Sequence, residues 1–358
     1  MEALMGISFS RWMELLREND FAVDPPYRKA AFRVTVGSLF NSLGRRRVQR
    51  EFGKQIKAAQ VPSPIFVLGH WRSGTTLLHE ILALDERFAY PNLLQVSNPN
   101  TFLVREPMAE RALAEQQRQK RAMDNVIVSY RSPGEDEFAL AVLSLRSVII
   151  GWSFPRNQAR YDRYLTFRDT PPEDAQAWQR SLVHFLKQLA VRHPGKPMLL
   201  KSPSHTGKVR LLLELFPDAR FVHIHRNPYV VFQSTKRLHE TNIVHNRYQD
   251  DGGDPTEGIL RRYVDLYDAF FADRTLIPPG RYCEVQFEVL ERNIVGEIER
   301  TYSELGLGEF EAVRPKVEAY AAEKADYQKN VHPSLDEDLR RRIAQSWRRC
   351  FDEWGYPV

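Results

Sequence analysis

The sequence predicts an α/β fold with a central, mainly parallel sheet, and three stretches of the chain carry this prediction. Residues 62–84 describe a short apolar strand, a glycine-bounded loop and a helix. Residues 197–238 alternate twice between a strand and a helix, and 282–305 repeat the pattern once. Strands that alternate with helices form parallel sheets, because each crossover helix packs back on the sheet. Ligands of such folds bind at the carboxyl ends of the strands.

Length and composition limit the number of domains, the kind of ligand and the cellular compartment that we expect. The chain has 358 residues and a formal charge of +5, which predicts one large domain or two small ones and suits an anionic ligand without indicating nucleic acid. The two cysteines offer no disulfide framework or metal pattern and fit a reducing compartment. No apolar run approaches the roughly 18 residues of a membrane span. We therefore expect a cytoplasmic protein.

The first 60 residues are expected to form two or three helices, a helical extension packed on a domain that comprises 61–358. A basic segment, G-R-R-R-V-Q-R-E, occupies 44–51 beside an apolar helix. Peripheral contact with an anionic membrane is one interpretation of this pairing. A solvated helix face is the other, and the sequence favours it.

The loop at 69–76 is the strongest local signal. Ile65–Leu68 is an unbroken apolar run, typical of a buried parallel strand, and helical spacing begins at Thr75. Gly69 and Gly74 keep the spacing of the nucleotide triphosphatase loop, but Thr75 replaces its lysine and Arg72 supplies a cation earlier. Backbone amides and the positive helix end make such a loop an anion site. Its candidate binding residues are Arg72, Ser73, Gly74, Thr75 and Thr76.

Residues 90–195 are expected to form a mostly helical insertion that covers the site and supplies specificity for a second ligand. A polar helix is predicted over 105–123, and 156–195 is helical with a break at Pro171–Pro172. Between them, Glu135, Asp136 and Glu137 open another helix. Acidic residues in a first turn usually complement the helix dipole, so that structural role competes with a catalytic one.

The second half of the chain places cations after two strands. Lys201 follows a strand at 197–200, and Arg226 follows a strand at 221–224. Ser234 lies eight residues beyond Arg226 on a helix, so both can reach one phosphate. A kinase of this shape would instead carry an aspartate for Mg²⁺ at a strand end. The C-terminal helix expected over 335–354 is a packing element.

Taken together, W-R-S-G-T-T at 71–76 and R-N-P-Y-V-V-F-Q-S at 226–234 resemble the motifs of PAPS-dependent sulfotransferases, in their bacterial form. The resemblance covers about 61–330. It implies a P-loop-like three-layer fold and 3′-phosphoadenosine 5′-phosphosulfate (PAPS) as co-substrate. It also implies metal-free, in-line transfer of a sulfuryl group to an acceptor hydroxyl, with release of PAP.

The resemblance also implies residue roles. The loop binds the 5′-phosphosulfate, while Arg226 and Ser234 grip the 3′-phosphate. Lys201, in K-S-P, resembles the K-D-P lysine of tyrosylprotein sulfotransferases and would stabilise the bridging oxygen together with Arg72. Two further residues match by position alone, Tyr282 beside the adenine and Lys329 over the 3′-phosphate.

The general base has two candidates, His205 and Glu137, with Asp136 and Glu135 as neighbours of the second. Cytosolic sulfotransferases carry a histidine in K-T-H, whereas this chain has K-S-P-S-H, so the register differs. The glutamate of tyrosylprotein sulfotransferases has no counterpart at 91–95. The acceptor is expected to be a hydroxyl of a small molecule, lipid or glycan, and apolar residues within 90–165 point to a hydrophobic or glycolipid alcohol. A P-loop kinase and a non-catalytic nucleotide-binding protein are the alternatives.

Overall fold

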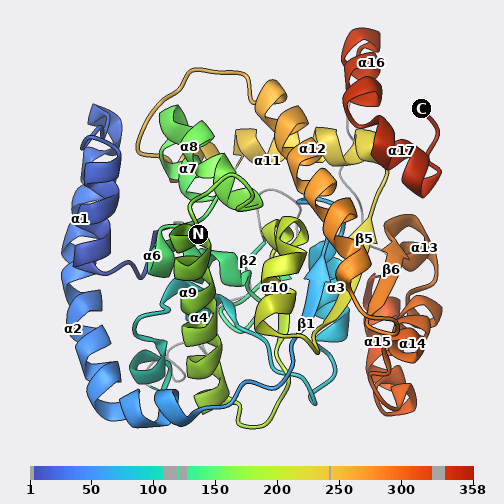
Figure 1. The fold of residues 1–358 in the computed structure, drawn as a ribbon, viewed down its shortest axis with the longest axis horizontal. Coiled ribbons are helices and arrows are strands. Elements are labelled where there is room, and N and C mark those ends of the chain that lie inside the picture. The colour runs from blue at the N-terminus through green and yellow to red at the C-terminus, as the bar shows by residue number, and fades with distance from the viewer. Residues whose placement is uncertain (1–3, 108–118, 121–126, 242, 325–334) are drawn as a thin grey trace. The chain divides into compact units, whose positions relative to one another are not determined.

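A computed structural model describes residues 4–107, 119–120, 127–241, 243–324 and 335–358 (Figure 1). The chain divides into two compact units. Unit 1 comprises Met1–Pro62, Tyr90–Met198 and Glu240–Gly253, and unit 2 comprises Ser63–Ala89, Leu199–His239 and Asp254–Val358. The N-terminal residues and the insertion predicted at 90–195 thus belong to one unit, and the predicted strands belong to the other.

The core of unit 2 is a four-stranded parallel sheet in the order β4-β1-β5-β6 (Figure 1). Its strands are β1 (Ile65–Leu68), β4 (Leu199–Lys201), β5 (Arg220–His225) and β6 (Tyr282–Gln286). The register pairs Val67 with Lys201, Leu68 with His223, and His225 with Gln286. All four carboxyl ends therefore lie along one edge of the sheet, and the segments that follow them share that edge.

The helices of unit 2 connect and extend these strands. They are α3 (Thr75–Leu82), the 3₁₀ helix η4 (Pro203–Lys208), α10 (Val209–Leu215), α11 (Pro228–Thr241), α12 (Thr256–Asp273), α13 (Phe287–Arg292), α14 (Ile294–Leu305), α15 (Arg314–Lys324), α16 (Glu337–Ser346) and α17 (Arg348–Trp354). The strands β1 and β4 are buried at every position, as expected for a sheet covered on both faces.

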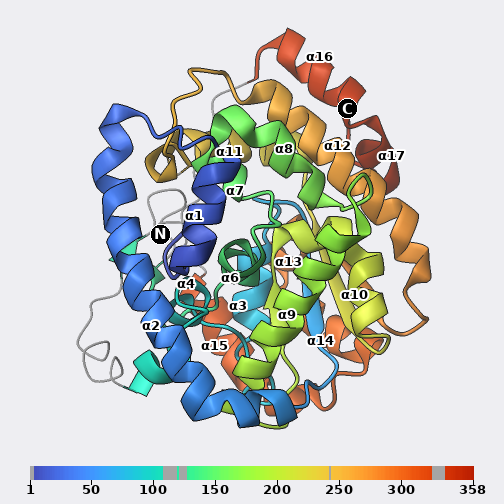
Figure 2. The same ribbon diagram turned by 60° about the vertical axis from the view of Figure 1, so that its left-hand side comes forward.

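Unit 1 is mainly helical. It contains α1 (Phe9–Glu18), α2 (Arg28–Ala58), α4 (Leu93–Ser97), α6 (Asp136–Ser144), α7 (Ile150–Ser153), α8 (Gln158–Asp162) and α9 (Pro172–Arg192). A short antiparallel pair, β2 (Gln119–Lys120) and β3 (Ile127–Val128), completes it. Trp12 of α1 and Trp178 of α9 are fully buried. Figure 2 shows α1 lying alongside the 31-residue helix α2.

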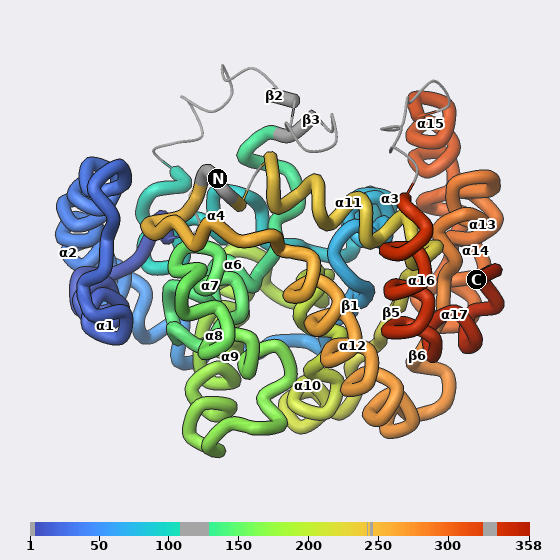
Figure 3. The backbone as a smooth tube through the Cα atoms, turned by 90° about the horizontal axis from the view of Figure 1, so that it is seen from above, coloured from blue at the N-terminus to red at the C-terminus, as the bar shows by residue number. Residues whose placement is uncertain are grey.

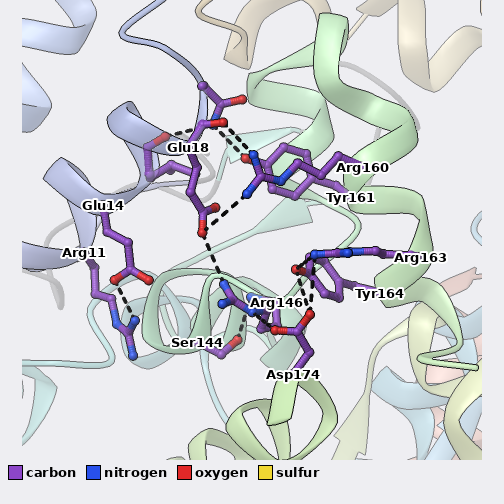
Figure 4. Close-up of polar contacts among 12 residues, drawn as sticks. Arg11, Glu14, Glu18, Ser144, Arg146, Arg160, Tyr161, Arg163, Tyr164 and Asp174 are labelled. Atoms are coloured by element: carbon purple, nitrogen blue, oxygen red, sulfur yellow. Dashed lines mark hydrogen bonds and ion pairs between the residues drawn. The ribbon is translucent and has the colours of Figure 1, made fainter. Parts of the chain in front are cut away.

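A network of ion pairs fixes α1 within unit 1 (Figure 4). Arg146 pairs with Glu18 at 3.6 Å and also with Asp174 of α9. Arg160 of α8 donates to the backbone carbonyl of Glu18 at 2.7 Å. Burial raises the pKa of Glu18, although Arg146 and Arg160 act in the opposite direction. Because three separate segments converge on Glu18 and Asp174, α1 is held to the helical core by charge as well as by apolar contact.

The predicted α/β class with a parallel sheet is confirmed, and the four predicted strands lie within two residues of their expected positions. Two helix predictions need correction. The helix expected over 105–123 is wrong at Gln119–Lys120, which forms β2, while 108–118 and 121–123 lie outside the described residues. The single helix expected over 335–354 is two helices, because the chain leaves helical geometry at Trp347. None of the helices in the described ranges is both long and apolar enough to span a membrane.

Candidate functional site

The loop between β1 and α3 has positive backbone φ angles at three positions, a conformation that favours glycine. Gly69 and Gly74 have φ values of +142° and +102°, and Arg72 lies in the left-handed region at +71°. A Cβ on Gly69 would lie 2.5 Å from the carbonyl oxygen of Ile224, and one on Gly74 would lie 2.3 Å from the Phe287 ring. Glycine is therefore required twice, for conformation and for space.

Hydrogen bonds from inside and outside the loop hold this shape. The Ser73 hydroxyl donates to the carbonyl oxygen of His70 at 2.8 Å. Thr206 of η4 accepts from the Gly69 amide at 2.7 Å and donates to the Gly69 carbonyl oxygen at 3.2 Å. The His70 amide donates to the Tyr267 hydroxyl of α12 at 3.2 Å. The loop is thus fastened to the turn after β4 and to α12.

Helix α3 begins directly after the loop, with Gly74 at its N-cap and Thr75 buried in its first turn. The first amide groups of a helix have no partner within the helix, and the helix dipole makes its N-terminus positive. Together with the Arg72 side chain, the loop therefore offers what a phosphate or sulfate group needs.

The structure brings the two sequence motifs together at Arg72. Its Nε donates to Ser234 Oγ of α11 at 2.8 Å, and Arg226 donates from Nη1 to the Arg72 carbonyl oxygen at 3.3 Å. Three side chains that the sequence assigned to two ends of one nucleotide lie in a single cluster. Two guanidinium groups and a hydroxyl so placed are suited to hydrogen-bond an oxyanion.

The guanidinium group of Arg226 packs on an aromatic ring and lies in the electrostatic field of two carboxylates. Its guanidinium carbon lies 4.1 Å from the centre of the Phe287 ring, a cation–π contact. Burial lowers the pKa of Arg226, and the carboxylates of Glu288 and Glu291 act in the opposite direction. Glu288 also accepts from the Asn227 amide at 3.0 Å and from the Tyr356 hydroxyl at 2.8 Å. Through these two hydrogen bonds, Glu288 connects Tyr356 near the C-terminus to Asn227, the residue after Arg226.

Lys201 ends strand β4 and His205 lies in the segment after it, but the two side chains differ in surroundings. Lys201 is the last residue of β4, at the carboxyl edge beside β1, and is 2% exposed. His205 lies in η4 and is fully buried. Its ring meets Phe66 of β1 edge-on, at 5.6 Å between centres, and Phe66 stacks on Phe221 of β5. His205 thus packs among the aromatic side chains of the sheet.

Of the remaining predicted residues, Tyr282 lies away from the cluster. Tyr282 pairs in register with Phe221, near the amino end of β5, and its hydroxyl donates to Glu284 at 2.8 Å. Tyr282 therefore begins β6 at the end of the sheet opposite the loop. Lys329 lies outside the described residues. Glu137 belongs to unit 1, where it sits in the first turn of α6 and accepts from the Ser147 hydroxyl at 2.6 Å.

Sequence reasoning missed Phe287, Thr206 and Tyr267. Phe287 directly follows β6, so its position at a strand end was a usable signal, yet nothing in its identity indicated a surface beneath an arginine. Thr206 lies within the conspicuous K-S-P-S-H-T-G-K segment, where the lysine and histidine drew attention first. Tyr267 is a helical aromatic residue, and no local pattern separates it from the core.

No group of three or more His, Cys, Asp or Glu side chains that could hold a metal ion occurs among the residues the structure describes. At the end of β5, where a P-loop kinase would carry its magnesium-binding aspartate, the chain has His225 followed by Arg226.

Comparisons with known proteins agree with this geometry. A sequence model described as the sulfotransferase family matches residues 64–312. The omega-hydroxy-beta-dihydromenaquinone-9 sulfotransferases Stf3 of Mycobacterium bovis and Mycobacterium tuberculosis are each 35% identical over 357 residues, covering 98% of this chain and 90% of theirs.

Solved structures show the same fold. Sulfotransferase STF9 from Mycobacterium avium superposes with a TM-score of 0.71 at 19% identity, over 97% of this chain and 92% of that one. Sulfotransferase STF1 from Mycobacterium tuberculosis H37Rv gives 0.58 at 16% identity, over 94% and 92%. The predicted resemblance is confirmed, and the kinase and non-catalytic alternatives are set aside. The chain belongs to the sulfotransferase family and is a PAPS-dependent sulfotransferase.

Proposed function

We propose that this enzyme transfers the sulfuryl group of PAPS to the terminal hydroxyl of a long-chain lipid alcohol of the isoprenoid quinone class. The observation that carries the proposal is the 35% identity, over 98% of the chain, to enzymes named for a hydroxylated dihydromenaquinone. Such an acceptor resides in a membrane, so the proposal includes peripheral contact with a lipid surface. The two buried free cysteines, Cys283 and Cys350, support placing the reaction in the reducing cytoplasm.

PAPS would be held by the cluster of unit 2. Arg226 and Ser234 are assigned to the 3′-phosphate, because an arginine fork and a hydroxyl at the end of a parallel strand suit one phosphate. The amides of the loop and of the first turn of α3, together with Arg72, are assigned to the 5′-phosphosulfate. Phe287 and Glu288 would act indirectly, by positioning Arg226.

The reaction needs one bond to form and one to break at sulfur. The acceptor oxygen attacks in line with the bond between sulfur and the bridging oxygen, that bond breaks, and PAP leaves with the bridging electrons. Lys201, at the carboxyl edge of the sheet, is assigned to the charge that develops on the bridging oxygen, with Arg72 beside it. The sulfuryl group carries less charge than a phosphoryl group, so side-chain cations are sufficient.

The proton of the acceptor hydroxyl requires a base, and we assign this role to Glu137 in preference to His205. Glu137 is oriented by the Ser147 hydroxyl and lies in the helical unit expected to receive the acceptor. His205 is fully buried against Phe66, which supports a packing role. Glu137→Gln should abolish turnover while PAP binding persists. His205→Asn should lower stability and leave turnover of the folded fraction near that of the wild type, and the reverse pattern would refute the assignment.

The acceptor class is tested by turnover. Purified enzyme with PAPS is offered an ω-hydroxylated menaquinone, a polyprenol, a glycolipid and a water-soluble phenol, and mass spectrometry detects the added SO₃ group. We expect product from the quinone and, more slowly, from the polyprenol. Faster sulfation of the glycolipid or the phenol would overturn the acceptor proposal and leave the transfer reaction intact.

A further inference from the structure

Helix α2 exposes large apolar side chains along one face. Phe32, Phe40 and Leu43 are 69%, 62% and 60% exposed, and Val36 and Leu39 are exposed as well. Isolated apolar residues are common on protein surfaces, but a contiguous patch marks a surface that meets another apolar phase. These five side chains lie within three turns of a single helix, so they form such a patch.

The same face turns basic in the second half of the helix. Steps of three and four residues connect eight exposed positions, here called the outer stripe: Phe32, Val36, Leu39, Leu43, Arg46, Arg50, Lys54 and Lys57. Residues at this spacing share one side of a helix. The outer stripe is therefore apolar along its first half and cationic along its second. The whole helix carries nine lysine and arginine residues and a single acidic one, Glu51.

The opposite face of α2 fixes the direction of the outer stripe. Val34, Ser38, Asn41, Val48 and Ile56 are buried, and they lie about half a turn away from the stripe. Trp12 of α1 donates to Thr35 Oγ1 at 2.8 Å, and Asn41 donates to the carbonyl oxygen of Ile7 at 3.0 Å. Figure 3 shows α1 lying beside α2 at the edge of unit 1. The stripe thus faces away from the helices that α2 packs on.

A further exposed aromatic residue, Phe9, lies where α1 is bonded to α2. The amide of Phe9, at the start of α1, donates to Ser42 Oγ at 2.8 Å, and the Phe9 side chain is 36% exposed. Glu18 at the other end of α1 is held by Arg146 and Arg160, as Figure 4 shows. Both ends of α1 are therefore anchored within unit 1, and α2 is presented on a fixed support.

We propose that the outer stripe docks the enzyme on the surface of an anionic lipid bilayer. Its apolar half enters the boundary between headgroups and acyl chains, and its basic half lies over the phosphates. A second copy of the chain fits less well. Two copies paired in parallel would place cations on cations, and two paired antiparallel would bury the arginines and lysines of each stripe on the apolar half of the other. This inference deepens the proposed function, because a lipid acceptor is reached at a membrane, but its test does not depend on turnover.

The experiment is co-sedimentation of the full chain with vesicles of phosphatidylcholine, with and without phosphatidylglycerol. Two triple variants each change one half of this face of α2. The first, Phe32→Ser, Phe40→Ser and Leu43→Ser, removes the three most exposed side chains of the apolar patch. The second, Arg46→Gln, Arg50→Gln and Lys54→Gln, removes three of the four cations of the outer stripe. We expect the wild type to bind only the anionic vesicles and each variant to bind them at least tenfold more weakly. Added salt should weaken vesicle binding by the wild type and by the variant that lacks the apolar side chains (the apolar variant), because both keep their cations. It should change little the binding of the variant that lacks the cations.

Two controls separate this from general effects of charge and hydrophobicity. Leu276→Ser removes an apolar side chain that is 51% exposed in unit 2, and Arg341→Gln, Arg348→Gln and Arg349→Gln remove exposed cations from α16 and α17. Both should bind like the wild type. PAP affinity, measured by calorimetry, should be unchanged in every variant and so reports that each one is folded.

Equal binding of the wild type and both triple variants would overturn the proposal, as would no binding to anionic vesicles. A wild-type dimer in light scattering that dissociates in the apolar variant would also overturn it, in favour of a second copy. Docking without sulfation of any lipid would leave the proposal standing and would count against the acceptor class alone.

Discussion

Arg72 Nε and Ser234 Oγ lie 2.8 Å apart, although 162 residues separate them in the chain. Arg72 belongs to the loop after β1 and Ser234 to the helix after β5. The two motifs that we assign to anion binding are therefore in direct contact. Replacing the serine therefore removes a hydrogen bond to Arg72 as well as any hydrogen bond to a bound phosphate.

Ser234→Ala should lower the affinity for PAP by about 10- to 100-fold, because a hydrogen bond to a charged group contributes about 1.5–3 kcal/mol. Calorimetry with PAP and AMP checks this. The affinity for AMP should change much less, because AMP lacks the 3′-phosphate assigned to Ser234.

Thr235→Val is the matched control for this change. Thr235 is the next residue on α11 and equally buried, and its hydroxyl has no hydrogen-bond partner among the described residues. Its variant should bind PAP like the wild type. An equal loss of AMP and PAP affinity in Ser234→Ala would show that the serine acts only through Arg72.

The sequence could predict what depends on local chemistry. The loop at 69–76 is recognisable from the spacing of its glycines and from the apolar strand before it. Once the strands are taken as parallel, their carboxyl ends must lie at one edge of the sheet. Arg226 and Ser234 could be found because they are cations or hydroxyls at such an edge. Their assignment to separate ends of the ligand did not foresee that Arg72 reaches Ser234, since side-chain reach across 162 residues has no local signal.

Residues that act through packing escaped prediction. Phe287 supports Arg226 and crowds Gly74, yet an aromatic residue after a strand is indistinguishable from core in one sequence. Tyr282 is the opposite case, a residue that was predicted for the site but lies away from the loop. Its place in β6 was predicted, but only the register shows that it starts the strand, away from the loop.

Gly74→Ala should destabilise the protein and weaken PAP binding together. The new Cβ would meet the Phe287 ring at 2.3 Å in a backbone with φ of +102°, so the ring must move, and Arg226 rests on that ring. Backbone strain and crowding each cost about 1–3 kcal/mol. Chemical denaturation and calorimetry measure the two effects.

Gly280→Ala isolates the backbone contribution. Gly280 has φ of +74°, and apart from Gly280 and its two chain neighbours no residue has an atom within 4 Å of the point that an alanine Cβ would occupy. Its variant should therefore lose about 1 kcal/mol of stability and no PAP affinity. If Gly74→Ala behaved like Gly280→Ala, the coupling from Gly74 through Phe287 to Arg226 would be refuted.

The loop histidine should make stability depend on pH. Burial lowers the pKa of His70 to about 4, and Arg262 acts in the same direction. The unfolded chain takes up this proton near pH 6.5 and the folded chain only near pH 4, so the free energy of unfolding falls as the pH drops through that window. The loss attributable to His70 approaches about 3 kcal/mol.

His70→Asn tests this dependence while keeping a donor for the Trp71 carbonyl oxygen, which His70 Nδ1 contacts at 2.8 Å. Urea unfolding gives the free energy of unfolding at each pH between 7 and 4. When this free energy is plotted against pH, the slope for the variant should be shallower by the equivalent of up to one bound proton. Other buried histidines, such as His225, keep their own contribution in both proteins. Parallel curves for the two proteins would contradict the prediction.

Lys201→Met should separate catalysis from nucleotide binding. Methionine keeps most of the buried volume of the lysine stem at the end of β4 but removes the charge assigned to the bridging oxygen. Because PAP lacks the sulfuryl group, its affinity should stay within a few fold of the wild type, while kcat falls by about 100- to 1,000-fold. Lys208→Met is the control, since Lys208 is equally buried in η4 and its Nζ contacts Ser204 Oγ at 3.4 Å. The control should retain kcat in its folded fraction, because Lys208 lies one 3₁₀ segment beyond the strand end. Equal losses of kcat in both variants would mean that Lys201 supports the fold of this segment and does not stabilise the leaving group.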